Sequence, residues 1–146
     1  MTHRELHLRP ATQSDAVLLG ELNHQLIQDE GHRNPMTVPE LQERMRGFLA
    51  EAYAVTLFER EGQIVAYALS REDPELIYLR QFFVQRPCRN QGVGNRALQL
   101  LRTQIWPAHK RLTVEVLTSN HAAISFYRKA GFSDYSLSLE ILPLPR

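Results

Sequence analysis

Cysteine is almost absent from this sequence, because Cys88 is the only thiol in 146 residues. A single thiol excludes an internal disulfide framework and is typical of a reducing compartment. Long apolar runs are also missing, since none approaches the ~20 residues that a membrane-spanning helix requires. The N-terminal stretch, Met1 to Pro10, lacks the apolar core of a signal peptide. These absences predict a cytoplasmic protein with no membrane partner.

An excess of charge of one sign is equally absent, because the formal net charge is +1. Such a chain has no general attraction for nucleic acid, so any anion site has to be local. His24 and His32 have no metal-ligand spacing with the cysteine or with each other. We therefore expect neither a nucleic-acid partner nor a metal. With 43% apolar residues, the chain can bury the core of one domain, which we place over residues 1–146.

The most informative segment follows an apolar run, Leu76 to Val84, and opens a helical pattern from Val93 to Ile105. It reads Arg89-Asn90-Gln91-Gly92-Val93-Gly94-Asn95. The first N–H groups of a helix lack intrachain partners and, together with the helix dipole, favour an anion. Glycine has no Cβ to keep a ligand from the backbone, and the Arg89 guanidinium suits a phosphate. The pattern predicts a cradle for a diphosphate.

Two other phosphate-binding loops resemble this segment. A nucleotide-triphosphate loop needs Lys-Ser/Thr after its last glycine, and Asn95-Arg96 stands there instead, which excludes it. The dinucleotide-binding fingerprint is matched by Gly92, Gly94 and Ala97. That fingerprint places its strand directly before the first glycine, whereas residues 85–91 intervene here. The dinucleotide interpretation therefore ranks second.

The third loop of this kind is the Arg/Gln-x-x-Gly-x-Gly/Ala motif, which residues 89–94 match. A second pattern follows it: an apolar strand from Leu112, then Asn120, then a helix that carries Tyr127 and closes with Gly131-Phe132. In spacing and order, the two patterns resemble the acetyl-CoA motif and the second motif of the GNAT superfamily of N-acetyltransferases. The resemblance covers roughly residues 4 to 142.

The resemblance implies an α/β fold, with a central mixed twisted sheet and helices on both faces. Local patterns agree, because the chain reads as strand, helix, helix, three strands, helix, strand, helix and strand. Thr37 and Glu40 form a capping box at the start of the second helix. Glu61-Gly62 joins two strands as a hairpin. Apolar alternation predicts a last strand over Ser136–Leu142.

The resemblance also implies which residues hold acetyl-CoA. The pantetheine arm pairs with the backbone of Phe82, Phe83 and Val84, where two parallel strands splay apart. The diphosphate binds the loop and helix start, which consist of Arg89, Asn90, Gln91, Gly92, Val93, Gly94 and Asn95. Asparagine is a preferred N-cap residue, so Asn120 is expected to cap the helix that follows it. The resemblance implies that Asn120 also touches the pantetheine arm.

Acid–base catalysis needs two further groups. Tyr127 matches the family's tyrosine, whose phenol, with an ordinary pKa of about 10, protonates the departing thiolate. The strand before the loop offers no base, because Arg80 stays protonated. Glu115 resembles the base of ribosomal-protein N-terminal acetyltransferases, although a solvated carboxylate or a partner for Arg80 fits the sequence equally well. A water relay to Glu72, Asp73 or Glu75 is the fallback.

These motifs predict an enzyme that moves an acetyl group from acetyl-CoA to a primary amine of a small molecule or a protein N-terminus. The alternative is a non-catalytic acyl-CoA-binding sensor or interaction module. Tyr127 favours the enzyme, and the missing base on the strand before the loop favours the module. Arg80 is expected to meet either an internal carboxylate or an anionic group of the acceptor. Many relatives pair through sheet edges or helices, so a homodimer is possible.

Overall fold

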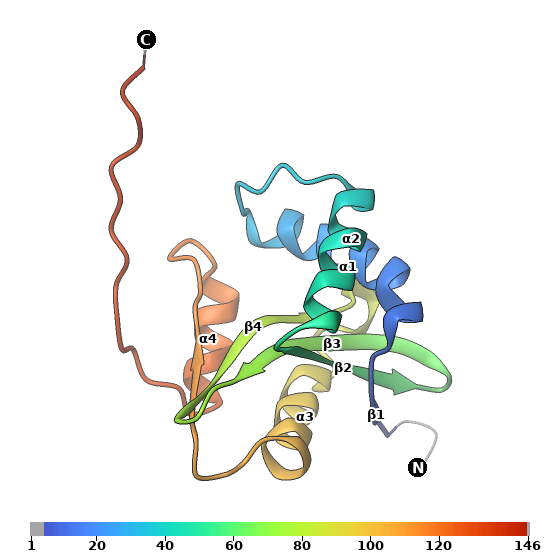
Figure 1. Cartoon of the computed structure of the whole chain (residues 1–146). Helices are drawn as coiled ribbons and strands as arrows, with labels where there is room; N and C mark the ends of the chain where they lie inside the picture. The colour runs from blue at the N-terminus through green and yellow to red at the C-terminus, as the bar shows by residue number, and fades with distance from the viewer. Residues whose placement is uncertain (1–4, 146) are drawn as a thin grey trace.

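The computed structural model describes residues 5–145 and contains a five-stranded sheet in the order β1-β2-β3-β4-β5 (Figure 1). Antiparallel neighbours are β1 (His7–Pro10), β2 (Tyr53–Arg60), β3 (Gln63–Glu72) and β4 (Leu76–Val84). β5 (Arg111–Val114) joins β4 in parallel. The parallel pair needs a long crossover, which α3 provides, whereas β2 and β3 are joined by a tight turn. The predicted mixed sheet is confirmed.

Local sequence signals explain where several elements start. Glu61 and Gly62, between β2 and β3, have φ angles of 54° and 77°, which a two-residue hairpin turn requires. Thr37 N donates to Glu40 Oε1 at 2.9 Å, and Glu40 N donates to Thr37 Oγ1 at 3.4 Å. This capping box starts α2 (Val38–Ala50). Both predictions are confirmed.

The other helices are α1 (Ala16–Glu30), α3 (Val93–Leu100) and α4 (His121–Lys129). A 3₁₀ turn, Gln13–Asp15, precedes α1, and Gly31 ends it in the left-handed conformation with φ of 71°. α3 continues into a π-helical turn, Leu101–Ile105. Between residues 5 and 145, no helix has the length and apolarity that crossing a bilayer demands.

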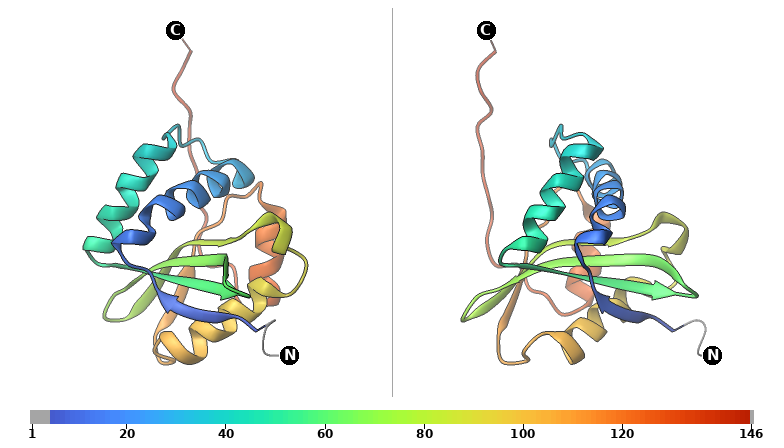
Figure 2. Two further views of the ribbon diagram at one scale, coloured as in Figure 1. Left: turned by 90° about the vertical axis from the view of Figure 1, so that its right-hand side faces the viewer. Right: turned by 45° about the vertical axis from the view of Figure 1, so that its right-hand side comes forward.

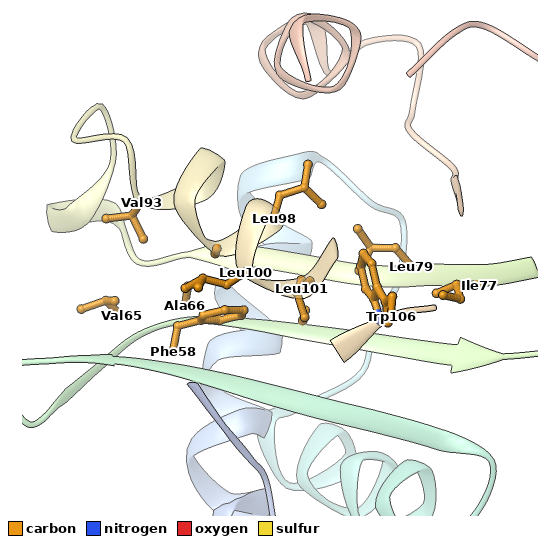
Figure 3. Packing of buried hydrophobic residues seen from close by; sticks show 12 residues of the cluster. Phe58, Val65, Ala66, Ile77, Leu79, Val93, Leu98, Leu100, Leu101 and Trp106 are labelled. Atoms are coloured by element: carbon orange, nitrogen blue, oxygen red, sulfur yellow. The ribbon is translucent and has the colours of Figure 1, made fainter. Parts of the chain in front are cut away.

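The helices cover both faces of the sheet, as predicted (Figures 1 and 2). α1 and α2 pack on one face, where Leu19, Met45 and Leu69 belong to one buried cluster. α3 and its π-helical turn pack on the opposite face, where Leu101 lies over Phe58 and neighbouring strand residues (Figure 3). Removing this apolar surface from water, at about 25 cal/mol per Å², is the main term that holds helices and sheet together.

A β-bulge interrupts β4 at Arg80. Gln81 pairs with Leu69 of β3 and Leu79 pairs with Ser70, so Arg80 lies between them as the extra residue. A bulge of this kind turns two successive side chains toward the same face. Here that face is the one covered by α1 and α2.

Parallel pairing between β4 and β5 ends beside the bulge. Leu76 pairs with Arg111, and the ladder reaches Leu79 and Val114, beyond which the described chain shows no further β4–β5 pairing. The second half of β4 therefore has a free backbone edge toward the residues that follow β5. The resemblance implied such an opening between two parallel strands.

The predicted last strand, Ser136–Leu142, is wrong. The segment is extended, but it has no hydrogen-bonded strand neighbour in the described chain. After α4 the chain leads away from the sheet in all three views (Figures 1 and 2). Alternating apolar residues indicate suitability for a pleated surface. A strand also needs an adjacent edge to pair with, and this segment does not reach one.

Candidate active site

A cavity of about 440 Å³ lies at the opening between β4 and the residues after β5. Its walls come from the second half of β4, the turn into α3, α4 and the end of α1. The predicted site residues among its lining are Phe82, Phe83, Val84, Arg89, Asn90, Gly92, Val93, Gly94, Asn95, Asn120 and Tyr127. The fold thus brings together all the predicted site residues except Gln91 and Glu115.

The turn before α3 has the backbone of an anion site. Gly92 precedes the helix with φ of 77°, a left-handed conformation that favours glycine. The first intrahelical hydrogen bond runs from Arg96 N to Gly92 O at 3.0 Å. The N–H groups of residues 93–95 come before this ladder, and all three residues line the cavity. With the positive end of the helix dipole, they suit a phosphate.

Gly94 is required by packing as well as by any ligand. A Cβ at this position would lie 3.2 Å from Cε1 of Phe126 and 3.8 Å from Cγ2 of Val84. The missing side chain lets α4 approach the turn closely. Gly94 therefore sets the distance between the two walls of the cavity, a role that its sequence motif did not reveal.

Arg89 lines the cavity, and its guanidinium is already engaged. Nε donates to the Val84 carbonyl at 2.8 Å, and Nη2 donates to Asp29 Oδ2 at 2.7 Å. Asp29 also pairs with Arg86. Arg86 first, and then Arg89, hold the pKa of the Asp29 carboxyl below its ordinary value. A phosphate that binds Arg89 therefore has to share its guanidinium with the ionised Asp29 carboxylate or displace that carboxylate. The sequence did not predict the pairing of Arg89 with Asp29.

Tyr127 lines the cavity from α4. Its ring packs edge-on against Phe126 and Phe132, with centroid distances of 5.2 Å and 5.3 Å. Burial, and after it the negative charge of Glu30, raise the pKa of the Tyr127 phenol above its ordinary value. The phenol therefore stays protonated at neutral pH. It can donate a proton to a leaving group but cannot serve as a base in its resting state.

Glu30 is the cavity carboxylate that sequence reasoning missed. Its side chain is 27% exposed, and its Oε1 lies 3.0 Å from His32 Nε2. Oε2 accepts a hydrogen bond from Asn120 Nδ2 at 3.3 Å. Burial raises the pKa of Glu30, and the hydrogen bond to His32 opposes part of this shift. A partly desolvated carboxylate with a raised pKa is a suitable proton acceptor.

A signal for Glu30 was present in the sequence. Leu19, Leu22 and Leu26 form the buried stripe of α1. Glu30 follows Leu26 by four residues, so it occupies the next position on the same helix face. A carboxylate at the end of an apolar stripe is unusual unless something specific satisfies it.

Glu115 lies outside the cavity, just after β5. Its carboxylate is exposed and accepts a hydrogen bond from the Tyr78 hydroxyl at 2.8 Å. Burial, together with this hydrogen bond, raises the pKa of Tyr78 to about 12. The bond to Tyr78 takes the place of the expected pairing with Arg80, and a catalytic role of Glu115 stays a prediction. Gln91 also turns from the cavity and accepts a hydrogen bond from Arg60 at 2.9 Å.

Solved structures share this architecture. A possible acetyltransferase from Clostridium difficile 630 is 12% identical, with a TM-score of 0.77, and the match covers 97% of this chain and 99% of that one. A predicted acetyltransferase from Clostridium acetobutylicum, solved with acetyl-CoA, is 20% identical, with a TM-score of 0.72 and coverage of 94% and 96%. An aminoglycoside acetyltransferase from an uncultured soil metagenomic sample, in complex with sisomicin, is 16% identical, with a TM-score of 0.68 and coverage of 97% of each chain.

No curated protein sequence matches this chain. A family model does match it over residues 21–132, and that family is the acetyltransferase (GNAT) family. The matched stretch contains every predicted residue of the cavity. The sheet, with its one parallel pair, also differs from the mostly parallel sheet of dinucleotide-binding folds, which sets the second-ranked interpretation aside. The sequence match and the shared fold lead to one conclusion: this chain belongs to the GNAT family of acetyltransferases.

Proposed function

We propose that this protein transfers the acetyl group of acetyl-CoA to a primary amine of a small molecule or of a protein N-terminus. One observation carries the proposal. The N–H groups at the start of α3, the residues Phe82–Val84 and the Tyr127 phenol all border a single cavity. Each of these groups answers one requirement of acetyl transfer, namely holding the diphosphate, holding the thioester arm and protonating the sulfur.

The two ends of the cavity suit the two chemically different parts of acetyl-CoA. The start of α3 offers hydrogen-bond donors and a positive dipole end to the diphosphate. The edge of β4 beyond Leu79, which is free of β5, offers N–H and C=O groups to the amides of the pantetheine arm. The rings of Phe82 and Phe126, with centroids 6.0 Å apart, line the cavity beside this edge. The acetyl-CoA in the Clostridium acetobutylicum structure supports this assignment.

In the proposed reaction, the amine nitrogen bonds to the thioester carbonyl carbon and the carbon–sulfur bond breaks. Tyr127 donates its phenol proton to the sulfur as negative charge develops there. A carboxylate takes the proton that the amine loses. Proton return from that carboxylate to the phenolate, through water, restores the starting state. The raised pKa of Tyr127 keeps the proton on the phenol until the sulfur becomes basic.

Two carboxylates are candidates for the base. Glu115 was predicted from the sequence, but it is exposed, bonded to Tyr78 and absent from the cavity lining. Glu30 lines the cavity together with Tyr127, and burial raises its pKa. We favour Glu30, because a base has to reach the amine directly or through one water. Glu115 is the comparison that tests this choice.

The acceptor class follows from weaker support. The metagenomic neighbour is an aminoglycoside acetyltransferase in complex with sisomicin, which supports a small-molecule acceptor. A protein N-terminus is the second class, and it rests on the position of Glu115 in the sequence motif alone. The single cysteine supports a cytoplasmic site of action.

Measuring CoA release from acetyl-CoA over a panel of small amines and short peptides tests the proposal. We expect release that depends on the amine and falls sharply in Tyr127→Phe. Acetyl-CoA binding by calorimetry without CoA release for any acceptor favours the non-catalytic acyl-CoA-binding module instead. If acetyl-CoA does not bind at all, both functions are wrong.

A further inference from the structure

Two arginines on the α2 side of the sheet have no acidic partner. Within residues 5–145, neither Arg44 nor Arg80 takes part in an ion pair. Arg44 lies on α2 and Arg80 at the bulge of β4. Their guanidinium carbons lie 5.5 Å and 5.1 Å from the centroid of the same ring, that of Phe48. Two positive charges are thus held against one aromatic side chain.

Both guanidinium groups hydrogen-bond only to neutral groups. Arg44 Nη2 donates to Asn23 Oδ1 at 2.8 Å, and Arg44 Nε is buried without a hydrogen-bond partner in the described structure. Arg80 Nη1 donates to the Tyr53 hydroxyl at 3.1 Å. Burial lowers the pKa of Arg44, and the charge of Arg80 lowers it further, yet a guanidinium stays protonated in proteins. The buried Nε of Arg44 is unfavourable until an acceptor satisfies it, whereas Arg80 is exposed and presents its charge to solvent.

This pair of arginines adjoins the cavity along two elements. On β4, Arg80 lies on the face of the sheet covered by α1 and α2, and so does Phe83, which lines the cavity. On α1, Asn23 lies about two turns before Glu30 and so shares its helix face. A molecule that bridges the arginines and the cavity would pass along the same face of α1.

We propose that Arg44 and Arg80 bind an anionic group of the amine acceptor, a carboxylate or a phosphate, while the amine enters the cavity. The assignment rests on the proposed function and names its substrate class. The guanidinium fork matches both anions geometrically, and stacking on Phe48 holds the two forks in place. An acceptor that carries only amines would be repelled at this position.

Matched acceptors that differ only in the anion test this proposal. Amino acids are compared with their α-amides, and phosphoethanolamine with ethanolamine, so the two pairs tell a carboxylate from a phosphate. We expect kcat/KM to be at least about tenfold higher for the anionic member of one pair. Arg44→Met and Arg80→Met should abolish this preference by raising KM. Arg46→Met is the matched control, because Arg46 lies on the same helix and pairs with Glu43.

A binding measurement separates this proposal from the proposed function. Glutarate and inorganic phosphate are titrated calorimetrically into the CoA-saturated protein. We expect at least one of them to bind wild type and Arg46→Met at least about tenfold more tightly than Arg44→Met and Arg80→Met. Anion binding without any acetyl transfer contradicts only the proposed function. Active transfer to neutral amines, with no anion dependence in either experiment, overturns the arginine assignment.

Discussion

The chain before and after Trp106 is packed very differently. Up to Trp106, strands and helices bury side chains completely, as at Leu19, Tyr67 and Leu69. Beyond Trp106, none of the described residues is fully buried, and Tyr127 is half-buried against the core, although β5 and α4 are regular elements. Regular hydrogen bonding therefore extends further along this chain than the core does. The comparison indicates that the residues after Trp106 are stabilised mainly by local hydrogen bonds and less by burial of apolar side chains.

The cavity lies on the boundary between these two regions. β4 and the turn into α3 belong to the well-packed region, whereas Asn120 and Tyr127 belong to the sparsely packed one. Segments with few buried apolar contacts open locally at lower free energy. The proposed phosphate end of the cavity is thus built on the well-packed region, and the proposed proton donor, Tyr127, on the region that opens more easily.

The largest difference is expected when a leucine is truncated in the well-packed region and, for comparison, in the sparsely packed region. Leu69→Ala removes a fully buried side chain and should lower the free energy of unfolding by about 3–4 kcal/mol. Leu139→Ala should change it by less than about 0.5 kcal/mol in dilute protein. Urea denaturation of the dilute proteins measures both losses. Equal losses at low concentration would remove the contrast between the regions.

Tyr127→Phe tests whether Tyr127, in the sparsely packed region, acts as a proton donor or only packs its ring against its neighbours. We expect kcat to fall roughly 10²-fold, with acetyl-CoA affinity and melting temperature nearly unchanged, because the donated proton matters mainly in the transition state. Tyr135→Phe, in the exposed stretch after α4, is the control and should retain activity. Wild-type turnover by Tyr127→Phe would mean that the ring only packs. A pre-steady-state burst shows whether slow product release hides the chemical step.

The two candidate bases lie in different regions, because Glu30 ends α1 in the well-packed region and Glu115 follows β5 in the sparsely packed one. If Glu30 is the base, Glu30→Gln should lower kcat/KM about tenfold or more and flatten the acidic limb of its pH profile. Glu115→Gln should then keep both rate and limb. The opposite outcome would assign the base to Glu115. Both variants have to be measured on the same acceptor, because the amine has its own titration.

Stability gives a second measurement on Glu30. Burial raises its pKa in the folded state, so folding favours the protonated carboxyl. The resulting stabilisation is present below the ordinary carboxyl pKa and is lost as pH rises through the folded-state value. Glu30→Gln should therefore be more stable than wild type at neutral pH, and the difference should vanish in acid. Thermal melts of both proteins across pH measure the sign of this stability difference. A Glu30→Gln variant that is less stable than wild type at neutral pH would contradict the prediction.

The smallest effect is expected from removing a helix cap in each region. Asn120 Oδ1 accepts a hydrogen bond from Ala123 N at 3.2 Å and caps α4, while Thr37 caps α2. Asn120→Ala and Thr37→Ala should each weaken their helix by about 1 kcal/mol. Hydrogen exchange should accelerate only within α4 in the first variant, because α4 opens locally. A global acceleration in Asn120→Ala would show that α4 unfolds with the core.

Local chemistry made much of the fold predictable. The capping box of Thr37 and Glu40 and the hairpin turn at Glu61-Gly62 depend only on residues within a few positions, and both are found as expected. The turn at Gly92 likewise depends on one residue in a left-handed conformation. Such features are decided by backbone dihedral preferences and side chain to backbone hydrogen bonds.

Features that depend on distant neighbours were not predictable in this way. Apolar alternation could not show that Ser136–Leu142 lacks an adjacent edge. The apolar stripe of α1 marks Glu30 as unusual, but its hydrogen bond to Asn120 joins residues 90 positions apart and could not be read from the stripe. The extra residue at Arg80 follows from the pairing register of β3 and β4. Each of these required the tertiary arrangement.

The bulge at Arg80 bears on how such a protein acquires new acceptors. Because Arg80 has no partner in β3, its replacement leaves the pairing of β3 and β4 intact. Mutation can therefore alter the acceptor side while Phe82–Val84 keep their register beside the cavity. Deleting the residue would remove the bulge, and Leu79 and Gln81 would become neighbours on opposite faces, as they already are, so the later side chains would keep their faces as well. The bulge therefore makes this one position of β4 free to vary, because the pairing of β3 and β4 does not depend on the residue that occupies it.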